Sequence, residues 1–156
     1  MARDFAVKAH GNQKYGSEPY IVHLDEVVAV LGEFGIKDEN LLVAGYLHDV
    51  IEDTDKSMDG IASVFGSEVA DFVWNVTGSG NNRKERSESI LKKLHGDTAA
   101  IPVKLADRIA NVRRSKASNP GLFKMYSLEY YDFKQALFDG SQNFINMWEC
   151  LDSLIR

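Results

Sequence analysis

The chain has 156 residues, of which 44% are hydrophobic and 26% are charged, and its formal net charge is −5. These values are those of an ordinary soluble globular protein that can bury a core, and they argue against a broad nucleic-acid-binding face, which would be basic. No apolar stretch is long enough to span a membrane, nothing at the N-terminus resembles a signal peptide, and the single Cys150 fits a reducing cytoplasm.

Apolar residues recur at helical spacing along the whole chain. A first short helix over residues 5–10 is followed by a polar loop over residues 11–19, in which glycines and a proline act as breakers. Further helices are predicted over residues 20–35, from 37–40 through 49, and over 58–65, 69–76, 83–96, 101–112, 122–138 and 144–155. No convincing alternating strand pattern is present. We therefore predict an all-α fold, with residues 1–156 forming one compact multi-helix domain.

The third predicted helix leads into a stretch with one imidazole and three carboxylates within residues 48–53. A histidine beside an aspartate, as at His48 and Asp49, offers a divalent cation a nitrogen and an oxygen, a mixture that suits zinc, manganese or iron. If the helix continues, Glu52 shares a face with both residues, and Asp53 shares a face with Asp49. Burying several carboxylates together is costly unless a cation or hydrogen-bond donors compensate for their charge. The alternative is a helix that ends in a solvated acidic turn.

A second informative residue is Asp107, which lies in the middle of an otherwise apolar helix. Asn111 follows it by one helical turn and lies on the same face. Taken alone, Asp107 is better explained by a surface ion pair with Lys104 or Arg108, because charged residues are usually solvated.

His23 lies in the first turn of its helix, where a histidine is more often a packed or capping side chain than a metal ligand. His10 and His95 stand at helix ends, where the helix dipole favours a cation, and are left out of the site. A metal site forms only if three helices converge on the four residues His23, His48, Asp49 and Asp107. Two nitrogens and two oxygens would leave further positions on the ion for water and substrate, which is a catalytic arrangement rather than a closed structural one.

Three motifs together resemble a known family. The chain resembles the hydrolase domain of RelA/SpoT-type alarmone enzymes at three motifs. These are Glu18-Pro19-Tyr20-Ile21-Val22-His23, the His-Asp-x-x-Glu-Asp-Thr segment from His48 to Thr54, and Lys104-Leu105-Ala106-Asp107-Arg108. The likeness covers roughly residues 5–135, with further support at residues 65–70 and 76–77. The size of the chain and the lack of a synthetase half make it similar to the stand-alone small alarmone hydrolases. The resemblance implies the HD-domain fold of metal-dependent phosphohydrolases.

The resemblance also implies roles for individual residues. His23, His48, Asp49 and Asp107 match the ligands of one manganese ion, although ligand type alone also admits Fe²⁺ or Zn²⁺. Glu52 and Asp53 match the catalytic acidic pair of the family. Asn111 and Tyr130 match residues that contact the nucleotide. The implied reaction is hydrolysis of the 3′-pyrophosphate of (p)ppGpp, which gives GDP or GTP and pyrophosphate.

A highly charged diphosphate needs cations around it, because phosphoryl transfer depends mainly on positioning and charge stabilisation. Candidate cations are Lys14, Arg83, Lys84, Arg86 and Arg113. For the cluster at residues 83–86 the alternative is a solvated helix start.

The sequence departs from the family pattern in two places. Alarmone hydrolases usually carry an arginine-lysine pair that packs against the purine and reaches the phosphates, whereas this chain has Lys14-Tyr15. Tyr15 can take over the stacking on the base, but a charge that faces the phosphates is then lost. The residue after His23 is Leu24 instead of the usual proline. The first departure leaves the base preference open.

Three functions therefore stand beside one another. The leading expectation is a manganese-dependent 3′-pyrophosphohydrolase of guanosine alarmones. The first alternative, motivated by Lys14-Tyr15, is an HD-type phosphohydrolase that acts on another nucleotide, such as the adenine alarmone (p)ppApp or a nucleotide 2′- or 3′-phosphate. The second is a non-catalytic nucleotide-binding module, which has no physical need for the six metal-binding and acidic positions. The expected partner is a small-molecule nucleotide, with no nucleic acid and no membrane, and the oligomeric state is not readable from the sequence.

Overall fold

The computed structural model describes residues 1–156, and nearly all of its regular structure is helical. The elements follow in the order α1 (Ala2–His10), β1 (Lys14–Tyr15), β2 (Glu18–Pro19), α2 (Ile21–Glu33), α3 (Glu39–Leu47), α4 (Val50–Asp53), α5 (Met58–Phe65), α6 (Ser67–Asn75), α7 (Arg83–Gly96), the short 3-10 helix η1 (Thr98–Ala100), α8 (Ile101–Ser118), α9 (Pro120–Leu137) and α10 (Ile145–Ile155). The predicted all-α fold is confirmed. None of the helices has the length and apolar character needed to cross a membrane.

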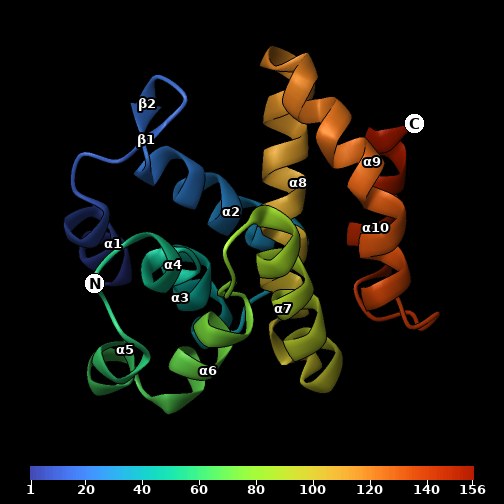
Figure 1. Cartoon of the computed structure of the whole chain (residues 1–156). Helices are drawn as coiled ribbons and strands as arrows, with labels where there is room; N and C mark the ends of the chain where they lie inside the picture. The colour runs from blue at the N-terminus through green and yellow to red at the C-terminus, as the bar shows by residue number, and fades with distance from the viewer.

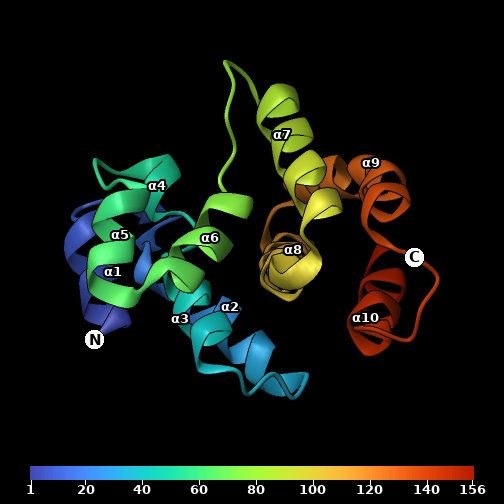
Figure 2. The same ribbon diagram turned by 90° about the horizontal axis from the view of Figure 1, so that it is seen from below.

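Helix α8 runs through the middle of the molecule, between two groups of helices (Figures 1 and 2). Helices α2 and α3 pack against it on one side, and α9 and α10 pack against it on the other. Its buried residues include apolar ones such as Leu105 and Ile109, and also the charged Asp107 and Arg108. Pro102 lies in its first turn, where the missing N–H would have had no helical partner. Side chains on α8 therefore reach the interior from the centre of the fold.

Helices α2 and α3 lie unusually close together at Gly45. A Cβ atom at this position would lie 2.9 Å from Cδ1 of Leu31 and 3.1 Å from Cγ2 of Val28, so a larger residue would push the two helices apart. Asp38 caps α3 by accepting a hydrogen bond of 3.0 Å from the backbone N–H of Leu41. The close packing brings the end of α3 toward the first turn of α2.

The helix that carries the His-Asp pair is interrupted. Helix α3 ends at Leu47 and α4 begins at Val50, so the continuous helix that would place Glu52 on one face with His48 and Asp49 is not formed. Asp49 has φ −102° and ψ 0°, the bridge region of backbone space, where many active-site residues are found. The break changes the directions in which side chains of α3 and α4 point relative to a continuous helix.

The polar loop over residues 11–19 contains a very short hairpin. Strands β1 and β2 pair antiparallel, with Lys14 opposite Pro19 and Tyr15 opposite Glu18. Gly16 in the turn has φ 62°, a conformation that glycine adopts without the usual steric cost. Two residues per strand are too few for a period of two to show in the sequence, which explains why no strand was predicted.

Candidate metal centre

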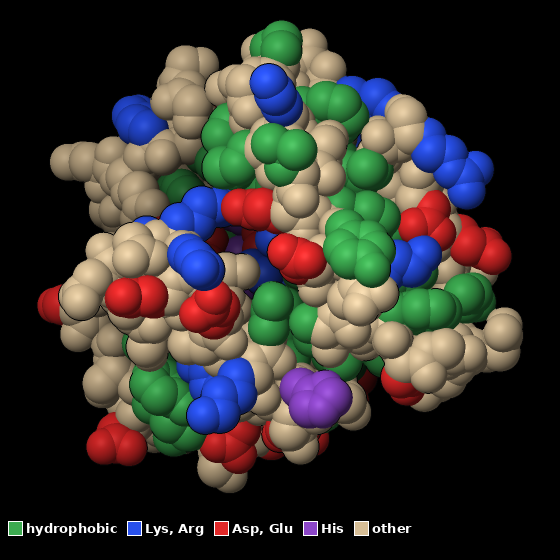
Figure 3. Space-filling model, turned by 45° about the vertical axis from the view of Figure 1, so that its right-hand side comes forward, with side chains coloured by type: hydrophobic (Ala, Val, Ile, Leu, Met, Phe, Trp, Pro, Cys, Tyr) green, Lys and Arg blue, Asp and Glu red, His purple; other side chains and the backbone are tan.

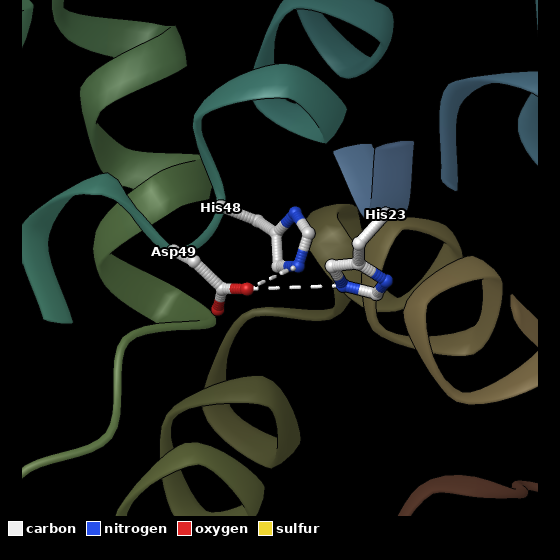
Figure 4. Close-up of side chains that lie close together, drawn as sticks. All are labelled: His23, His48 and Asp49. Carbon is white, nitrogen blue, oxygen red and sulfur yellow. Dashed lines mark ion pairs between the residues drawn. The ribbon is translucent and has the colours of Figure 1, made fainter. Parts of the chain in front are cut away.

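Side chains from α2, from the α3–α4 junction and from α8 meet at one buried point. The Nε2 atom of His23 lies 3.1 Å from Oδ1 of Asp107 and 3.8 Å from Oδ2 of Asp49. The Nε2 atom of His48 lies 3.0 Å from Oδ2 of Asp49 and 3.5 Å from Oδ1 of Asp107. Figure 4 shows the two imidazoles and the Asp49 carboxylate turned toward one another, with ligand atoms that all lie within 4.8 Å. The fold thus brings together the four residues that the sequence singles out as metal ligands.

The orientation of His48 fits a metal ligand. Its Nδ1 atom lies 2.8 Å from the carbonyl oxygen of Gly45, and a carbonyl can only accept, so Nδ1 carries the proton. When Nε2 is deprotonated, it presents its lone pair to the common point. This atom is buried and has no hydrogen-bond partner, which is costly for a polar atom unless a ligand binds there. A backbone carbonyl that fixes the tautomer of a histidine is the usual support of a metal-bound imidazole.

The electrostatics of the four residues favour a positive charge at their centre. Burial alone would raise the pKa of Asp49 and of Asp107, but neighbouring cations outweigh it: His48 lowers the pKa of Asp49, and Lys104 followed by the two histidines lowers that of Asp107. Burial lowers the pKa of His48, but the charges of the two aspartates prevail and raise it well above 6.5. A proton and a divalent cation would compete for the same nitrogen, so metal binding should release a proton.

A further layer of hydrogen bonds holds the two aspartates. The hydroxyl of Tyr20 donates to Oδ2 of Asp49 over 2.5 Å. Lys104 donates to Oδ2 of Asp107 over 2.9 Å, and Asn111 donates to Oδ1 of the same carboxylate over 2.8 Å. Burial, followed by the charge of Asp49, raises the pKa of Tyr20, so this hydroxyl keeps its proton and remains a donor.

Sequence reasoning missed Tyr20 and Lys104 as parts of the site. Lys104 precedes Asp107 by three residues, a spacing that places the two on one helix face, and it was weighed only as a surface partner. Tyr20 lies inside the Glu18–His23 motif, immediately before α2. Helical periodicity could not show that its hydroxyl reaches Asp49, because that contact joins distant parts of the chain.

A cavity of about 260 Å³ opens beside these residues. Figure 3 shows a hollow on one face of the molecule with basic and acidic side chains around its mouth. The cavity lining includes four cationic side chains and four aromatic ones: Arg83, Arg86, Lys104 and Arg108, and Tyr15, Tyr20, Tyr126 and Phe133. Cations for phosphates and rings for an organic group therefore surround the same space that reaches His23, Asp49 and Asp107.

The two predicted acids lie in different surroundings. Glu52 lines the cavity, where the backbone N–H of Gly78 lies 3.4 Å from Oε2 and Nε of Arg86 lies 3.6 Å from Oε1. Burial, followed by the charge of Asp49, raises the pKa of Glu52. Asp53 is more exposed, does not line the cavity, and accepts a hydrogen bond of 2.9 Å from Gln13. Of the pair, Glu52 is the acid that faces the space for a substrate.

The residues predicted to bind substrate are divided by the structure. The cavity is lined by Tyr15, Arg83, Arg86 and Asn111. It is not lined by Lys14, Lys84, Arg113 or Tyr130. Arg113 is paired with Glu33 over 2.7 Å. Tyr130 donates its hydroxyl to Asp152, and Lys84 lies 3.9 Å from Glu88.

One cavity residue that sequence reasoning missed is Arg108, noted there only as a neighbour of Asp107. It is buried, donates to Glu129 over 2.9 Å, and its guanidinium lies 4.5 Å from the ring centre of Phe133. Glu129 also accepts from Arg83 over 2.7 Å. One carboxylate therefore fixes two cations at the wall of the cavity.

Known proteins resemble this chain in sequence and in fold. The profile of the HD domain family matches residues 2–129. A probable guanosine-3′,5′-bis(diphosphate) 3′-pyrophosphohydrolase of Synechocystis is 37% identical over 74% of this chain, and an Aquifex aeolicus protein named as the same hydrolase is 38% identical over 72%. The chain spans only 16% and 17% of the length of these two relatives.

Shorter relatives match over most of their length. The human guanosine-3′,5′-bis(diphosphate) 3′-pyrophosphohydrolase MESH1 is 33% identical over 90% of this chain and 83% of its own. The solved structure of a metazoan ortholog of SpoT, which hydrolyses ppGpp and plays a role in starvation responses, superposes with a TM-score of 0.85 and 27% identity, over 99% of this chain and 92% of the other. The chain therefore belongs to the HD domain family, and its relatives of similar length include MESH1 proteins.

Proposed function

We propose that this protein hydrolyses the 3′-pyrophosphate of guanosine alarmones, so that ppGpp and water give GDP and pyrophosphate, and pppGpp gives GTP and pyrophosphate. The observation that carries the proposal is the convergence of His23, His48, Asp49 and Asp107 beside a cavity with cationic walls. The names of the relatives support the substrate, since MESH1 of zebrafish, mouse and human are all named as hydrolases of this compound. The lone Cys150 supports a reducing, cytoplasmic location for this reaction.

The four converging residues would hold one divalent cation, which we propose to be Mn²⁺, with Fe²⁺ or Zn²⁺ as alternatives for the same nitrogen and oxygen donors. When bound, such a cation acts as a Lewis acid on a phosphoryl oxygen and makes water more acidic. The protein supplies the geometry: Gly45 fixes the tautomer of His48, and Tyr20, Lys104 and Asn111 fix the two carboxylates. A pre-arranged site requires little reorganisation when charge develops.

We propose that Glu52 orients the attacking water and accepts its proton. Its raised pKa brings this carboxylate closer to neutral pH, where a base with a matched pKa works best. Asp53, held by Gln13, would adjust the charge around Glu52 from outside the cavity. General base catalysis of this kind contributes about 10²- to 10⁴-fold in rate.

The cavity wall suits a substrate that carries several phosphates. Glu129 pairs with both Arg83 and Arg108, and Arg86 forms a longer ion pair with Glu52 over 3.6 Å. We propose that these arginines turn toward the phosphates when a substrate binds. Arginine presents several donors in one plane and binds phosphate oxygens in pairs. Tyr126, which lies 5.1 Å from the guanidinium of Arg108, presents an aromatic surface in the same cavity.

A second candidate substrate is an adenine alarmone such as (p)ppApp or another nucleotide with a 2′- or 3′-phosphate. The observation that favours it is Tyr15, whose ring packs 4.6 Å from the imidazole of His23 and 4.6 Å from the guanidinium of Arg114. Residues 14 and 15 are Lys14 and Tyr15, so the chain lacks the arginine-lysine pair against which the alarmone hydrolases that it resembles are expected to pack guanine.

One assay tests both candidates. Purified protein with added Mn²⁺ is incubated side by side with ppGpp and ppApp, and pyrophosphate and orthophosphate are both measured. We expect release of pyrophosphate from ppGpp that a chelator abolishes. Equal or faster turnover of ppApp would support the second substrate, whereas metal-loaded protein that binds ppGpp and leaves it intact would support a non-catalytic nucleotide-binding module.

A further inference from the structure

Tyr15 contacts His23 directly and is linked to Asp107 through Asn111. Its ring packs on the imidazole of His23, with 4.6 Å between ring centres and 35° between the planes. Its hydroxyl donates over 2.5 Å to Oδ1 of Asn111, whose Nδ2 donates over 2.8 Å to Oδ1 of Asp107. The sequence gives no hint of these contacts, because hairpin and helix α8 are distant in the chain.

The direction of this hydrogen-bond chain is fixed by its ends. The Asp107 carboxylate accepts hydrogen bonds from Lys104 at Oδ2 and from Asn111 at Oδ1, so Asn111 turns its amide N–H toward it. The amide oxygen of Asn111 then faces Tyr15, which must donate. The oxygen of Asp107 at the end of the chain is the one that lies 3.1 Å from Nε2 of His23. The Tyr15 hydroxyl thus supports, through the Asn111 amide, the carboxylate oxygen of Asp107 that faces His23.

The ring of Tyr15 also contacts Arg114 and Tyr20. The guanidinium of Arg114 lies 4.6 Å from the ring centre and is itself paired with Glu18 and Glu26. The ring of Tyr20 meets that of Tyr15 edge-on, with centres 6.0 Å apart. These contacts take up ring surface on which a purine would otherwise stack.

We propose that Tyr15 is a positioning residue of the metal centre, which holds the His23 ring by packing and the Asp107 carboxylate through Asn111. This role rests on the metal centre of the proposed function and not on the identity of the substrate. It differs from the nucleotide contact predicted for Tyr15 from the sequence, and the two roles give different results. A residue that orients ligands changes the affinity for metal, whereas a residue that stacks on a base changes the KM for the nucleotide.

The experiment measures Mn²⁺ binding to the metal-free protein by calorimetric titration, without nucleotide. Tyr15→Phe removes the hydroxyl and keeps the ring, and we expect it to weaken Mn²⁺ binding by about tenfold, the lower end of the range for groups that support metal ligands. Tyr15→Leu removes both contacts and should weaken binding by up to about 100-fold. Tyr131→Phe is the matched control, because Tyr131 is 69% exposed, and it should bind Mn²⁺ as the unaltered protein does.

A double variant tests the route through Asn111. If the hydroxyl acts through the amide, Tyr15→Phe should weaken Mn²⁺ binding no further in a chain that already carries Asn111→Ala. At saturating Mn²⁺, the KM of Tyr15→Phe for ppGpp should stay within about twofold. Unchanged Mn²⁺ affinity in Tyr15→Phe, or additive effects in the double variant, would overturn the inference.

The Mn²⁺ titration distinguishes a failure of this inference from a failure of the proposed function. If the unaltered protein binds Mn²⁺ but leaves ppGpp intact, the substrate assignment fails while the metal titration still decides the role of Tyr15. A raised KM in Tyr15→Phe with unchanged Mn²⁺ affinity would return Tyr15 to the nucleotide. A protein that binds no divalent cation at all would overturn both.

Discussion

The Nε2 atom of His23 lies 3.1 Å from Oδ1 of Asp107, although the two residues belong to α2 and α8, which are far apart in the sequence. This contact exists only because α2 packs along α8, so the positions of the candidate metal ligands depend on the packing of the core helices. The same oxygen lies 3.5 Å from Nε2 of His48 on a third segment. We propose that the two imidazoles and two carboxylates in this geometry form one cation site.

Removal of one ligand should remove the metal. We expect Asp107→Ala and His48→Ala to lose bound Mn²⁺ and to lower pyrophosphate release from ppGpp by at least about 1,000-fold, because a metal ion supplies several kcal/mol of transition-state stabilisation. Elemental analysis and a pyrophosphate assay measure the two effects. His95→Ala, an exposed histidine at the end of α7, is the control and should keep both. Full activity in Asp107→Ala would rule out the proposed ligand set.

Removal of the base should separate rate from metal binding. Glu52→Gln keeps the shape of a side chain that lines the cavity but cannot accept a proton, so we expect normal Mn²⁺ content and a kcat lower by about 10²- to 10⁴-fold. Glu88→Gln, on the exposed side of α7, should keep the full rate. A kcat for Glu52→Gln within a few-fold of normal would assign the proton transfer to another group.

The raised pKa of Glu52 predicts a pH-dependent stability of the metal-free protein. Burial, and then the charge of Asp49, lifts this pKa above 4.5, so the folded state holds the proton more tightly than the unfolded chain. The stability from this group is therefore present below pH 4.5 and is lost as the pH rises through the folded-state value. Metal-free Glu52→Gln should have a higher Tm than the unaltered protein at about pH 7, and the difference should shrink at about pH 4. Calorimetry that shows no such convergence would contradict the assigned shift.

Close packing at Gly78 should be sensitive to a single methyl group. A Cβ atom there would lie 2.7 Å from Cβ of Arg86 and 2.8 Å from Oε1 of Glu52, so Gly78→Ala must shift both contacts. We expect a loss of about 1–3 kcal/mol in the free energy of unfolding, as for other overpacked sites, together with a lower kcat. Gly96→Ala is the matched control, because nothing lies within 4 Å of its added Cβ, and it should be neutral or slightly stabilising in a helix. Equal behaviour of the two variants would show that Gly78 has no such role.

Much of the fold is readable from the sequence because most of its helices carry apolar residues at helical spacing. Helices such as α2 and α7 begin and end close to the predicted residues, and the glycines and prolines between helices mark the turns. The motif spacing also singled out the four residues that converge. The usual solvation of charged residues favoured a surface ion pair for Asp107, and only the resemblance carried by the three motifs indicated a metal ligand.

The remaining features depend on contacts that no local pattern encodes. The hairpin at residues 14–19 is too short to show alternation, yet it sets Tyr15 against His23. No proline or glycine stands at residues 48–49, where α3 and α4 are separated, so the sequence shows no reason for the break. Arg113 and Tyr130 match substrate-contacting types, but tertiary packing places them against Glu33 and Asp152, and their predicted contact with nucleotide stays a prediction.

The central claim is that one divalent cation binds where α2, the α3–α4 junction and α8 meet. The most direct test is a crystal grown with Mn²⁺ and measured at the manganese absorption edge. We expect one strong anomalous peak in contact with Nε2 of His23, Nε2 of His48 and the carboxylates of Asp49 and Asp107, and no such peak in Asp107→Ala. Well-ordered crystals that show no manganese at this point, or manganese held by other residues, would contradict the account.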